Sequence, residues 1–399
     1  MLKFSISTNN NLNIDNLKDA IVNYTLSKQK DEGFLILFED IKFQNNINSK
    51  DGEISDILKK FAIDTEQKIY QSDQLKIYQK FARKLIENKK AFICFCSDDS
   101  DSCNNSCINL TQQDLKNKIE SNKPYKICLI DSSKEAYNFT ILNRDKNPSS
   151  LFSYAIDNMV LGVTEVISTD INIEDIDKID TIYKALDFNQ DIKYTIIGSI
   201  TDKKDINITI ESLLKEGYLP DAIINYIVTL IHPTPKKIFY LPDVVKWLDL
   251  NNLFANPSKF NIDELKVVNQ EHLKNIDSKK LSNIFGFSDS NIGDLLKLYL
   301  KKYSTISQLE QKLNMIFSKK DCSKNIDNIK LLSDIIFKAP IIDDYNQFEQ
   351  YILNKISIDK NELNDILHIL LGIEKKDGIE LKEIYPFIKS YILEVTQCQ

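Results

Sequence analysis

The sequence has few of the residues on which nucleotide-binding and histidine-dependent enzymes rely. It contains nine glycines among 399 residues, a low number for a chain that wraps a nucleotide, because glycine lets the backbone approach phosphates closely. Its three histidines leave little room for histidine-based acid–base catalysis. No apolar run approaches the roughly 20 residues of a membrane span, and the start of the chain has no signal-peptide pattern. We therefore expect a cytoplasmic protein without a membrane partner.

The charge and the cysteine content narrow the classes of partner and site. The formal net charge is -7 at pH 7, which argues against indiscriminate nucleic-acid binding through a basic surface, and we expect no DNA partner. The hydrophobic content of 42% is enough for a sizeable core in about two to four domains. We expect the seven cysteines to be free thiols or metal ligands rather than disulfides, because the cytosol keeps thiols reduced.

The first 40 residues predict a strand, a loop, a helix and a second strand. Residues 3–7 read as a short buried strand, and residues 34–38 are an apolar run of strand length. Between them apolar residues recur at helical spacing, at Leu17, Ala20, Ile21 and Tyr24. In α/β nucleotide-binding folds the ligand lies where the first strand leads into the helix. Here that turn, residues 8–16, contains no glycine and several asparagines, whose side chains fill the space that a phosphate needs. The position for a nucleotide is present, but the residues that bind phosphate are largely missing.

A group of cysteines predicts a metal site. They form the pattern C-x-C-x6-C-x3-C, at Cys94, Cys96, Cys103 and Cys107. Four soft ligands this close together can complete a tetrahedral zinc site on a loop. Such a site would be structural, because four thiolates leave no open position for water. The alternative is a set of loosely placed, reduced cysteines that remain from a lost site.

The N-terminal stretch resembles the bacterial glutamyl-tRNA synthetase family, class I synthetases whose first strand and helix read RFAPSPTGxLHIGxxR. The framework of that motif is kept at Phe4, Ser7, Leu12, Ile14 and Ala20. Its HIGH signature is replaced by Asn13, Ile14, Asp15 and Asn16. Lysine replaces both arginines, at Lys3 and Lys18, whereas the Glu-Asp pair of the family's R-I-E-D-T-D survives as Glu39 and Asp40.

The resemblance continues along the chain but is poor at the reactive positions. Residues 70–97 are similar to the family's YQSxRxxxYxxxAxxLxxxGxAYxCxCS, and residues 156–167 to VVDDxLMGITHVI. Ser150 stands at the tyrosine of the PTY motif, and Ser168 at the arginine that would pair with the substrate; a serine cannot replace a bidentate guanidinium.

The second ATP signature, KMSKS, is also eroded. Counting back from residues 216–220, which match the family's EGYLP, places it at Thr201, Asp202, Lys203 and Lys204. Only Lys203 keeps a key position, and Asp202 would set a carboxylate against the triphosphate. The remaining candidates for substrate binding are Lys3, Ser7, Glu39, Asp40 and Lys203. We expect structural zinc, and we do not expect ATP to bind.

The resemblance implies a fold and a division into domains. The expected fold is an α/β Rossmann-like class I synthetase catalytic domain with an α+β insertion, followed by all-α C-terminal domains. Residues 1–225 would form the catalytic-type domain, with an acceptor-binding-type insertion at about 70–150. Residues 226–290 would form a helical stem-contact-type domain, and 291–399 a shortened helical domain of the anticodon-binding type.

Three functions remain open from the sequence. The leading hypothesis is a catalytically inactive relative of glutamyl-tRNA synthetase that acts by binding tRNA or a partner protein, because framework positions are kept while the reactive positions are lost together. The second is an active glutamate–tRNA ligase, or another adenylate-forming enzyme, with altered contacts. The third is a protein–protein scaffold that does not bind tRNA.

Overall fold

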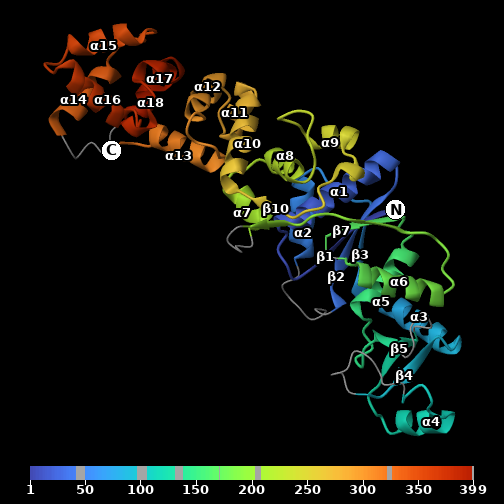
Figure 1. The fold of residues 1–399 in the computed structure, drawn as a ribbon. Helices are drawn as coiled ribbons and strands as arrows, with labels where there is room; N and C mark the ends of the chain where they lie inside the picture. Colours follow the sequence, from blue (N-terminus) through green and yellow to red (C-terminus); the bar gives the residue numbers. More distant parts are fainter. Residues whose placement is uncertain are drawn as a thin grey trace. The chain divides into compact units, whose positions relative to one another are not determined.

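The computed structural model describes residues 1–41, 50–96, 106–130, 138–169, 171–202, 208–320 and 326–397 (Figure 1). The chain folds into two compact units. The first unit comprises Met1–Glu211, Ile227–Pro235 and Phe239–Phe260, and the second comprises Ser212–Tyr226, Lys236–Ile238 and Asn261–Gln399. Among the described residues, no helix is long and apolar enough to cross a membrane.

The first unit opens with the predicted strand–helix–strand. A parallel three-stranded sheet has the order β1 (Leu2–Ser7), β2 (Phe34–Glu39), β3 (Gln67–Tyr70), and α1 (Ile14–Lys30) connects its first two strands. The four apolar residues that predicted the helix are all buried in α1. In β1 the apolar residues Leu2, Phe4 and Ile6 alternate with polar ones, so that strand presents an apolar and a polar face.

A second parallel pair continues the α/β arrangement. It consists of β7 (Glu165–Ser168) and β8 (Lys193–Ile196), connected by α6 (Ile173–Ala185) and preceded by α5 (Ser150–Val160). The backbone nitrogen of Thr164 donates to the carbonyl of Met1 (3.1 Å), which joins the start of β7 to β1. Further along the chain, β9 (Ile200–Asp202) pairs in parallel with β10 (Ser258–Phe260).

The insertion has the predicted α+β character. Its sheet is antiparallel and consists of β4 (Ala91–Cys94), β5 (Lys126–Ile130) and β6 (Asn138–Leu142). The helices α3 (Leu75–Glu87) and α4 (Gln112–Glu120) belong to the same part of the chain. One face of α3 buries Tyr78, Ala82 and Leu85.

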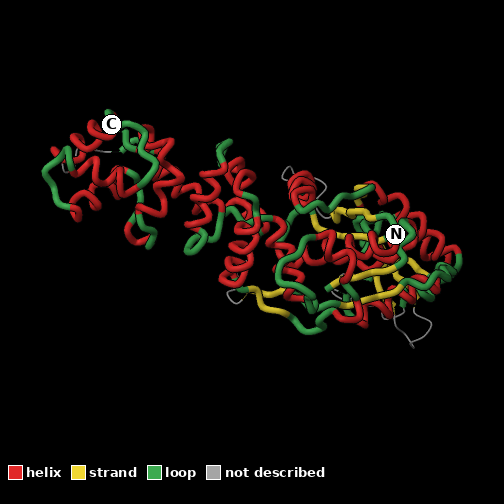
Figure 2. Tube along the Cα trace, turned by 90° about the horizontal axis from the view of Figure 1, so that it is seen from above, coloured by secondary structure: helices red, strands yellow, loops and turns green. Residues whose placement is uncertain are grey.

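The described residues from Asn261 onward fold into helices joined by loops (Figure 2). They bury one large apolar core, which includes Leu273 of α10, Leu281 of α11 and Ile292 of α12. The helices are α10 (Ile262–Asn275), α11 (Ser278–Ile284), α12 (Ser290–Tyr299), α13 (Ile306–Phe317), α14 (Ile326–Phe337), α15 (Tyr345–Leu353), α16 (Lys360–Leu370), α17 (Leu381–Ile388) and α18 (Ile392–Val395). Elsewhere the chain forms α2 (Asp51–Lys60), α7 (Ile210–Lys215), α8 (Pro220–Ile231) and α9 (Leu241–Trp247). The predicted division at residues 225 and 290 stays a prediction.

Candidate functional site

The turn between β1 and α1 closes on itself through asparagine side chains. Oδ1 of Asn13 accepts a hydrogen bond from the backbone nitrogen of Asn16 (2.8 Å), and Oδ1 of Asn16 accepts one from the backbone nitrogen of Asn13 (3.4 Å). This capping box satisfies backbone donors at the helix N-terminus that an anion would otherwise use. The backbone nitrogen of Ile210 donates to the carbonyl of Leu12 (2.9 Å), and Thr209 forms a β-bridge with Asn13. Residues 209–210 therefore lie against this turn.

Asp15 and Lys18 link the first turns of α1 to two other segments of the first unit. The Nζ of Lys18, which is fully buried, lies 2.6 Å from Oδ1 of Asp15. The same Oδ1 accepts a hydrogen bond from the backbone nitrogen of Ile200 (2.7 Å). Lys18 also donates to Oγ1 of Thr169 (2.6 Å) and to the carbonyl of Gly198 (2.9 Å). Asp15, in the degenerate first signature, thus binds the backbone of Ile200, the residue directly before the expected second signature.

A second carboxylate completes this network. Oδ1 of Asp19 lies 3.3 Å from Nζ of Lys18 and accepts a hydrogen bond from Oγ1 of Thr169 (3.2 Å). Burial raises the pKa of Asp19 to about 6, although the charge of Lys18 lowers it. At neutral pH two carboxylates therefore share one ammonium group, and the excess negative charge repels phosphate.

The expected KMSKS segment is described in part. Ile200 begins β9 opposite Ser258, and Thr201 is exposed. Asp202 ends the strand, but its side chain lies outside the described residues, as do Lys203 and Lys204. The role expected of Lys203 stays a prediction.

Lys3 is a buried lysine on the polar face of β1. Its Nζ donates to Oδ1 of Asn158 (2.6 Å) and lies 4.3 Å from the ring centroid of Tyr154, and both partners come from α5. Burial lowers the pKa of Lys3, whereas the charges of Asp157 and Glu39 raise it. This cation, predicted as a substrate contact, is therefore engaged by the protein's own helix.

Asp157 anchors the same helix to the start of the insertion. It is 2% exposed, and it accepts hydrogen bonds from the hydroxyl of Tyr78 (2.6 Å) and from Nε2 of Gln71 (2.8 Å). Burial raises the pKa of Asp157, although the charge of Lys3 lowers it. The carboxylate has two strong donors, so it serves to hold α3 and α5 together.

The other predicted contacts have mixed environments. Ser7 is paired with Glu39 in the β1–β2 register, and its Oγ accepts a hydrogen bond from the backbone nitrogen of Asn9 (3.4 Å). Asp40 accepts hydrogen bonds from the backbone nitrogen and the hydroxyl of Ser72, at 2.8 and 2.6 Å. The structure thus places Ser7 beside Glu39, whose negative charge raises the pKa of Lys3. Asp40 instead binds the backbone of the short helical turn that begins at Gln71.

Several residues of this network are absent from the set predicted by the sequence. Tyr154 and Asn158 are four residues apart on α5, so they share a helix face, and that spacing was an available signal. Thr169 and Gly198 carry no local signal, because they meet Lys18 only after the chain has folded. Ser150 begins α5 and Ser168 ends β7, at the positions expected from the resemblance.

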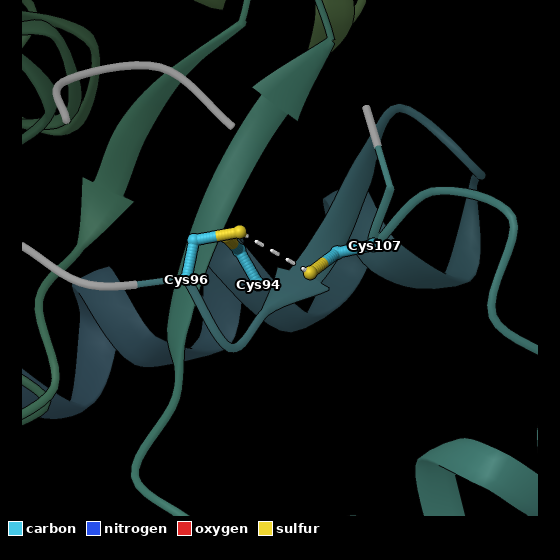
Figure 3. A group of neighbouring side chains, drawn as sticks. All are labelled: Cys94, Cys96 and Cys107. Atoms are coloured by element: carbon cyan, nitrogen blue, oxygen red, sulfur yellow. Dashed lines mark hydrogen bonds between the residues drawn. The ribbon is translucent and has the colours of Figure 1, made fainter. Parts of the chain in front are cut away.

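Three of the four predicted metal ligands meet at the end of β4 (Figure 3). The Sγ atoms of Cys94, Cys96 and Cys107 all lie within 4.8 Å of one another, and Cys96 and Cys107 are 3.6 Å apart. A tetrahedral zinc ion with Zn–S bonds of about 2.3 Å sets its sulfur atoms roughly 3.8 Å apart, so these thiols fit zinc. The backbone nitrogen of Phe95 donates to Sγ of Cys107 (3.4 Å). Cys103 lies outside the described residues.

Comparisons with known proteins show the family to which the chain is similar. The family model described as tRNA synthetases class I (E and Q), catalytic domain, matches residues 2–120. The chain is 35% identical to glutamate–tRNA ligase 2 of Sulfurovum sp. (strain NBC37-1), over 99% of this chain and 100% of the relative. It is 32% identical to glutamate–tRNA ligase 2 of Sulfurimonas denitrificans, over the full length of both.

A solved structure supports the fold in the same way. The glutamate–tRNA synthetase from Elizabethkingia anophelis superposes with a TM-score of 0.73 at 16% identity, covering 98% of this chain and 97% of that one. At this identity the likeness concerns the fold. It confirms the predicted class I catalytic domain with an insertion and helical C-terminal part.

Proposed function

The chain belongs to the glutamyl-tRNA synthetase family of class I tRNA synthetases, and we propose that it is a member that does not activate an amino acid and acts by binding tRNA. The proposal joins two features of the molecule. The chain aligns with its named relatives over almost its whole length. At the position of the first ATP signature, Asn13, Asp15 and Asn16 bond to the protein's own backbone.

The hydrogen bond from the backbone nitrogen of Ile200 to Asp15 carries the proposal (2.7 Å). Lys18 also donates to the carbonyl of Gly198, so one backbone donor and one backbone acceptor beside the start of α1 are already bonded to side chains of α1. A nucleotide entering here would have to displace partners of the buried Lys18 and would then face the carboxylates of Asp15 and Asp19. Both steps disfavour ATP, because buried charges that lose their partners cost several kcal/mol.

The residues expected to contact the amino-acid substrate also differ from those of the family. Lys3 replaces the family's arginine and is engaged by Asn158, and Ser168 stands where the family has the arginine that pairs with the substrate. Lysine and serine cannot supply the bidentate contact of a guanidinium to a carboxylate. Loss at the ATP and amino-acid positions together supports a protein without ligase activity.

We assign tRNA as the partner because the named relatives are glutamate–tRNA ligases and because the insertion is kept. Residues 70–150 contain 13 basic and 10 acidic side chains, in contrast to the negative charge of the whole chain. In this proposal the insertion binds the acceptor end, residues 226–290 contact the stem, and the shortened end at 291–399 does not read the anticodon.

A tRNA gel shift at several salt concentrations tests the binding function. We expect a shift with the tRNA pool that weakens steeply as salt rises, because phosphate contacts release counterions. The absence of any shift at low salt would favour the protein–protein scaffold. Recovery of the full chain from its native cell, with identification of co-eluting RNA and protein, then identifies the partner.

An active ligase with altered contacts is the second candidate function. It is favoured by polar groups beside Lys3: the hydroxyl of Ser5 and the amide nitrogen of Asn158 are buried without a hydrogen-bond partner among the described residues. In that case Lys3, Ser7, Glu39, Asp40 and Lys203 would form the site. ATP–pyrophosphate exchange with each amino acid separates this candidate from the proposal.

We call the group formed by Cys94, Cys96 and Cys107 the thiol centre, and we propose that it holds one structural zinc ion. Cys94, Cys96 and Cys107 would supply three ligands in the observed arrangement and Cys103 the fourth. The ion would contribute no hydrolytic chemistry, because four thiolates leave no open position. Its role would be to fix a polar loop of the insertion.

A further inference from the structure

Arg144 lies against the thiol centre from a different part of the insertion. It is one of only two arginines in the chain, the other being Arg83. Its guanidinium nitrogen donates to the carbonyl of Cys96 at 2.5 Å, across 48 residues of sequence. A chain that uses lysine for almost all of its cations thus has an arginine at the turn that carries two of the thiols.

The segment that carries Arg144 is well held. The backbone nitrogen of Asn143 donates to the carbonyl of Asn147 (2.8 Å), and the backbone nitrogen of Lys146 donates to the carbonyl of Asn143 (3.0 Å). Asp145 accepts a hydrogen bond from the backbone nitrogen of Asn147 (2.9 Å). Arg144 therefore projects from a closed turn between β6 and α5, which is a firm base for orienting another loop.

The surroundings of the thiols carry further positive charge. Lys126 is 4% exposed and lies directly opposite Cys94 in the antiparallel β4–β5 register, so both side chains are on the same face of the sheet. The Nζ of Lys118 lies 5.2 Å from the ring centroid of Phe95, the residue between the first two cysteines. Cations from β5, from α4 and from the β6–α5 turn therefore lie against the short segment Cys94–Cys96, which carries two of the thiols.

This arrangement suits thiolates that hold a metal. A divalent ion bound by four thiolates carries a net charge of minus two, and by three thiolates minus one. Such charge in a largely buried cluster is stabilised by nearby cations and by donors such as the backbone nitrogen of Phe95. Groups outside the ligand shell also fix the geometry of the ligands, and their loss typically costs about 10–100-fold in metal affinity.

We propose that Arg144 is a positioning residue of the thiol centre, which fixes the turn from Cys94 to Cys96 through its bond to the Cys96 carbonyl and adds positive charge beside the metal-bound thiolates. This inference rests on the proposed zinc site. It assigns a role to a residue that the cysteine pattern does not reveal.

The test compares the full-length protein with Arg144→Gln, Arg144→Lys and the matched control Arg83→Gln. Each protein is loaded with zinc, its zinc content is measured, and the transfer of zinc to a chromophoric chelator is followed over time. We expect Arg144→Gln to release zinc about 10–100 times faster than the wild type. Arg144→Lys should release zinc at a rate between those of the wild type and Arg144→Gln, and Arg83→Gln should release it at the wild-type rate.

A second measurement separates positioning from a general loss of stability. The midpoint of thermal unfolding is recorded for each protein with zinc and after chelation. We expect Arg144→Gln to reduce the increase in midpoint that zinc gives, while the zinc-free midpoints stay close together. Zinc release from Arg144→Gln at the wild-type rate, or an equal fall of both midpoints, would overturn the role of Arg144. A wild-type protein that binds no zinc would instead overturn the zinc site itself, and this inference with it.

Discussion

The carboxylate of Asp15 lies 2.7 Å from the backbone nitrogen of Ile200 and accepts its hydrogen. These residues are 185 positions apart in the chain: Asp15 belongs to the degenerate first signature, and Ile200 comes directly before the expected second one. Here they contact each other. The bond connects the first turn of α1 to the start of β9.

Asp15→Ala should lower the free energy of unfolding by about 1.5–3 kcal/mol, because the change removes a charged acceptor from both Ile200 and the buried Lys18. Urea unfolding at pH 7 measures the difference. Asp56→Ala is the matched control, since Asp56 forms an exposed ion pair with Lys59, and its effect should stay within about 0.5 kcal/mol. Equal effects of the two changes would show that the Asp15 network does not stabilise the fold.

The stability of the second unit should depend on the protonation of His272. Its Nε2 lies 2.8 Å from Oδ1 of Asn225, and burial lowers the pKa of His272 to about 4 from its ordinary 6.5. Because the unfolded chain binds the proton more readily, the stability present above pH 6.5 is lost as the pH falls toward 4.

Between pH 7.5 and pH 5 the wild type should therefore lose about 2 kcal/mol more than His272→Gln, in which residue 272 no longer titrates. Urea unfolding at the two pH values gives this difference for both proteins. The same loss in both would show that His272 does not titrate with a lowered pKa.

The purified protein should contain one zinc ion per chain. The fit of Cys94, Cys96 and Cys107 to a tetrahedral ion supports this, and so does the C-x3-C spacing that adds Cys103. Elemental analysis should find the ion in the wild type and not in Cys103→Ser/Cys107→Ser, and affinity should fall at low pH as thiols become protonated. Zinc content near zero, or unchanged in the double variant, contradicts the site.

Binding of tRNA should depend on the insertion rather than on the C-terminal helices. Lys116→Gln/Lys123→Gln removes two exposed charges from the insertion, and Lys338→Gln/Lys355→Gln removes two from the helical end. The first pair should weaken binding and reduce the slope of log affinity against log salt by roughly 0.7–0.9 per lost phosphate contact. The second pair should bind like the wild type. The reverse order would place the tRNA on the helical end.

These substitutions are preferable to a truncation after residue 290. Leu273 and Leu281 share one apolar core with Ile292 and the helices that follow, so a cut there would expose that core. Gly293 also packs directly on the backbone of Ser278, where an added Cβ would lie 1.9 Å from the carbonyl oxygen.

The sequence predicts the elements that depend on local periodicity. The apolar spacing in α1, the alternation in β1 and the apolar run of β2 are sufficient, because the burial of apolar side chains decides these elements. The thiol cluster is predicted for a similar reason, since Cys94 and Cys96 are close in the chain and must be close in space.

The side-chain network of the site could not be predicted in the same way. Lys18 is found by alignment to an arginine of the family, but its burial and its contacts with Thr169 and Gly198 arise from segments more than 150 residues away. Arg144 is 48 residues from Cys96 in sequence, which is also beyond the reach of local patterns. Such contacts depend on the packing of whole elements, for which a single sequence carries no local signal.

ATP–pyrophosphate exchange in the presence of glutamate tests most directly whether the protein lacks the activity of a glutamate–tRNA ligase. Loss of one preorganised donor to the reacting group typically costs about 10²–10³ in rate, and here several such positions have changed together. We expect no exchange above the blank, while an active glutamate–tRNA ligase assayed in parallel gives a clear signal. Glutamate-dependent exchange that is abolished by Lys203→Ala would contradict the claim.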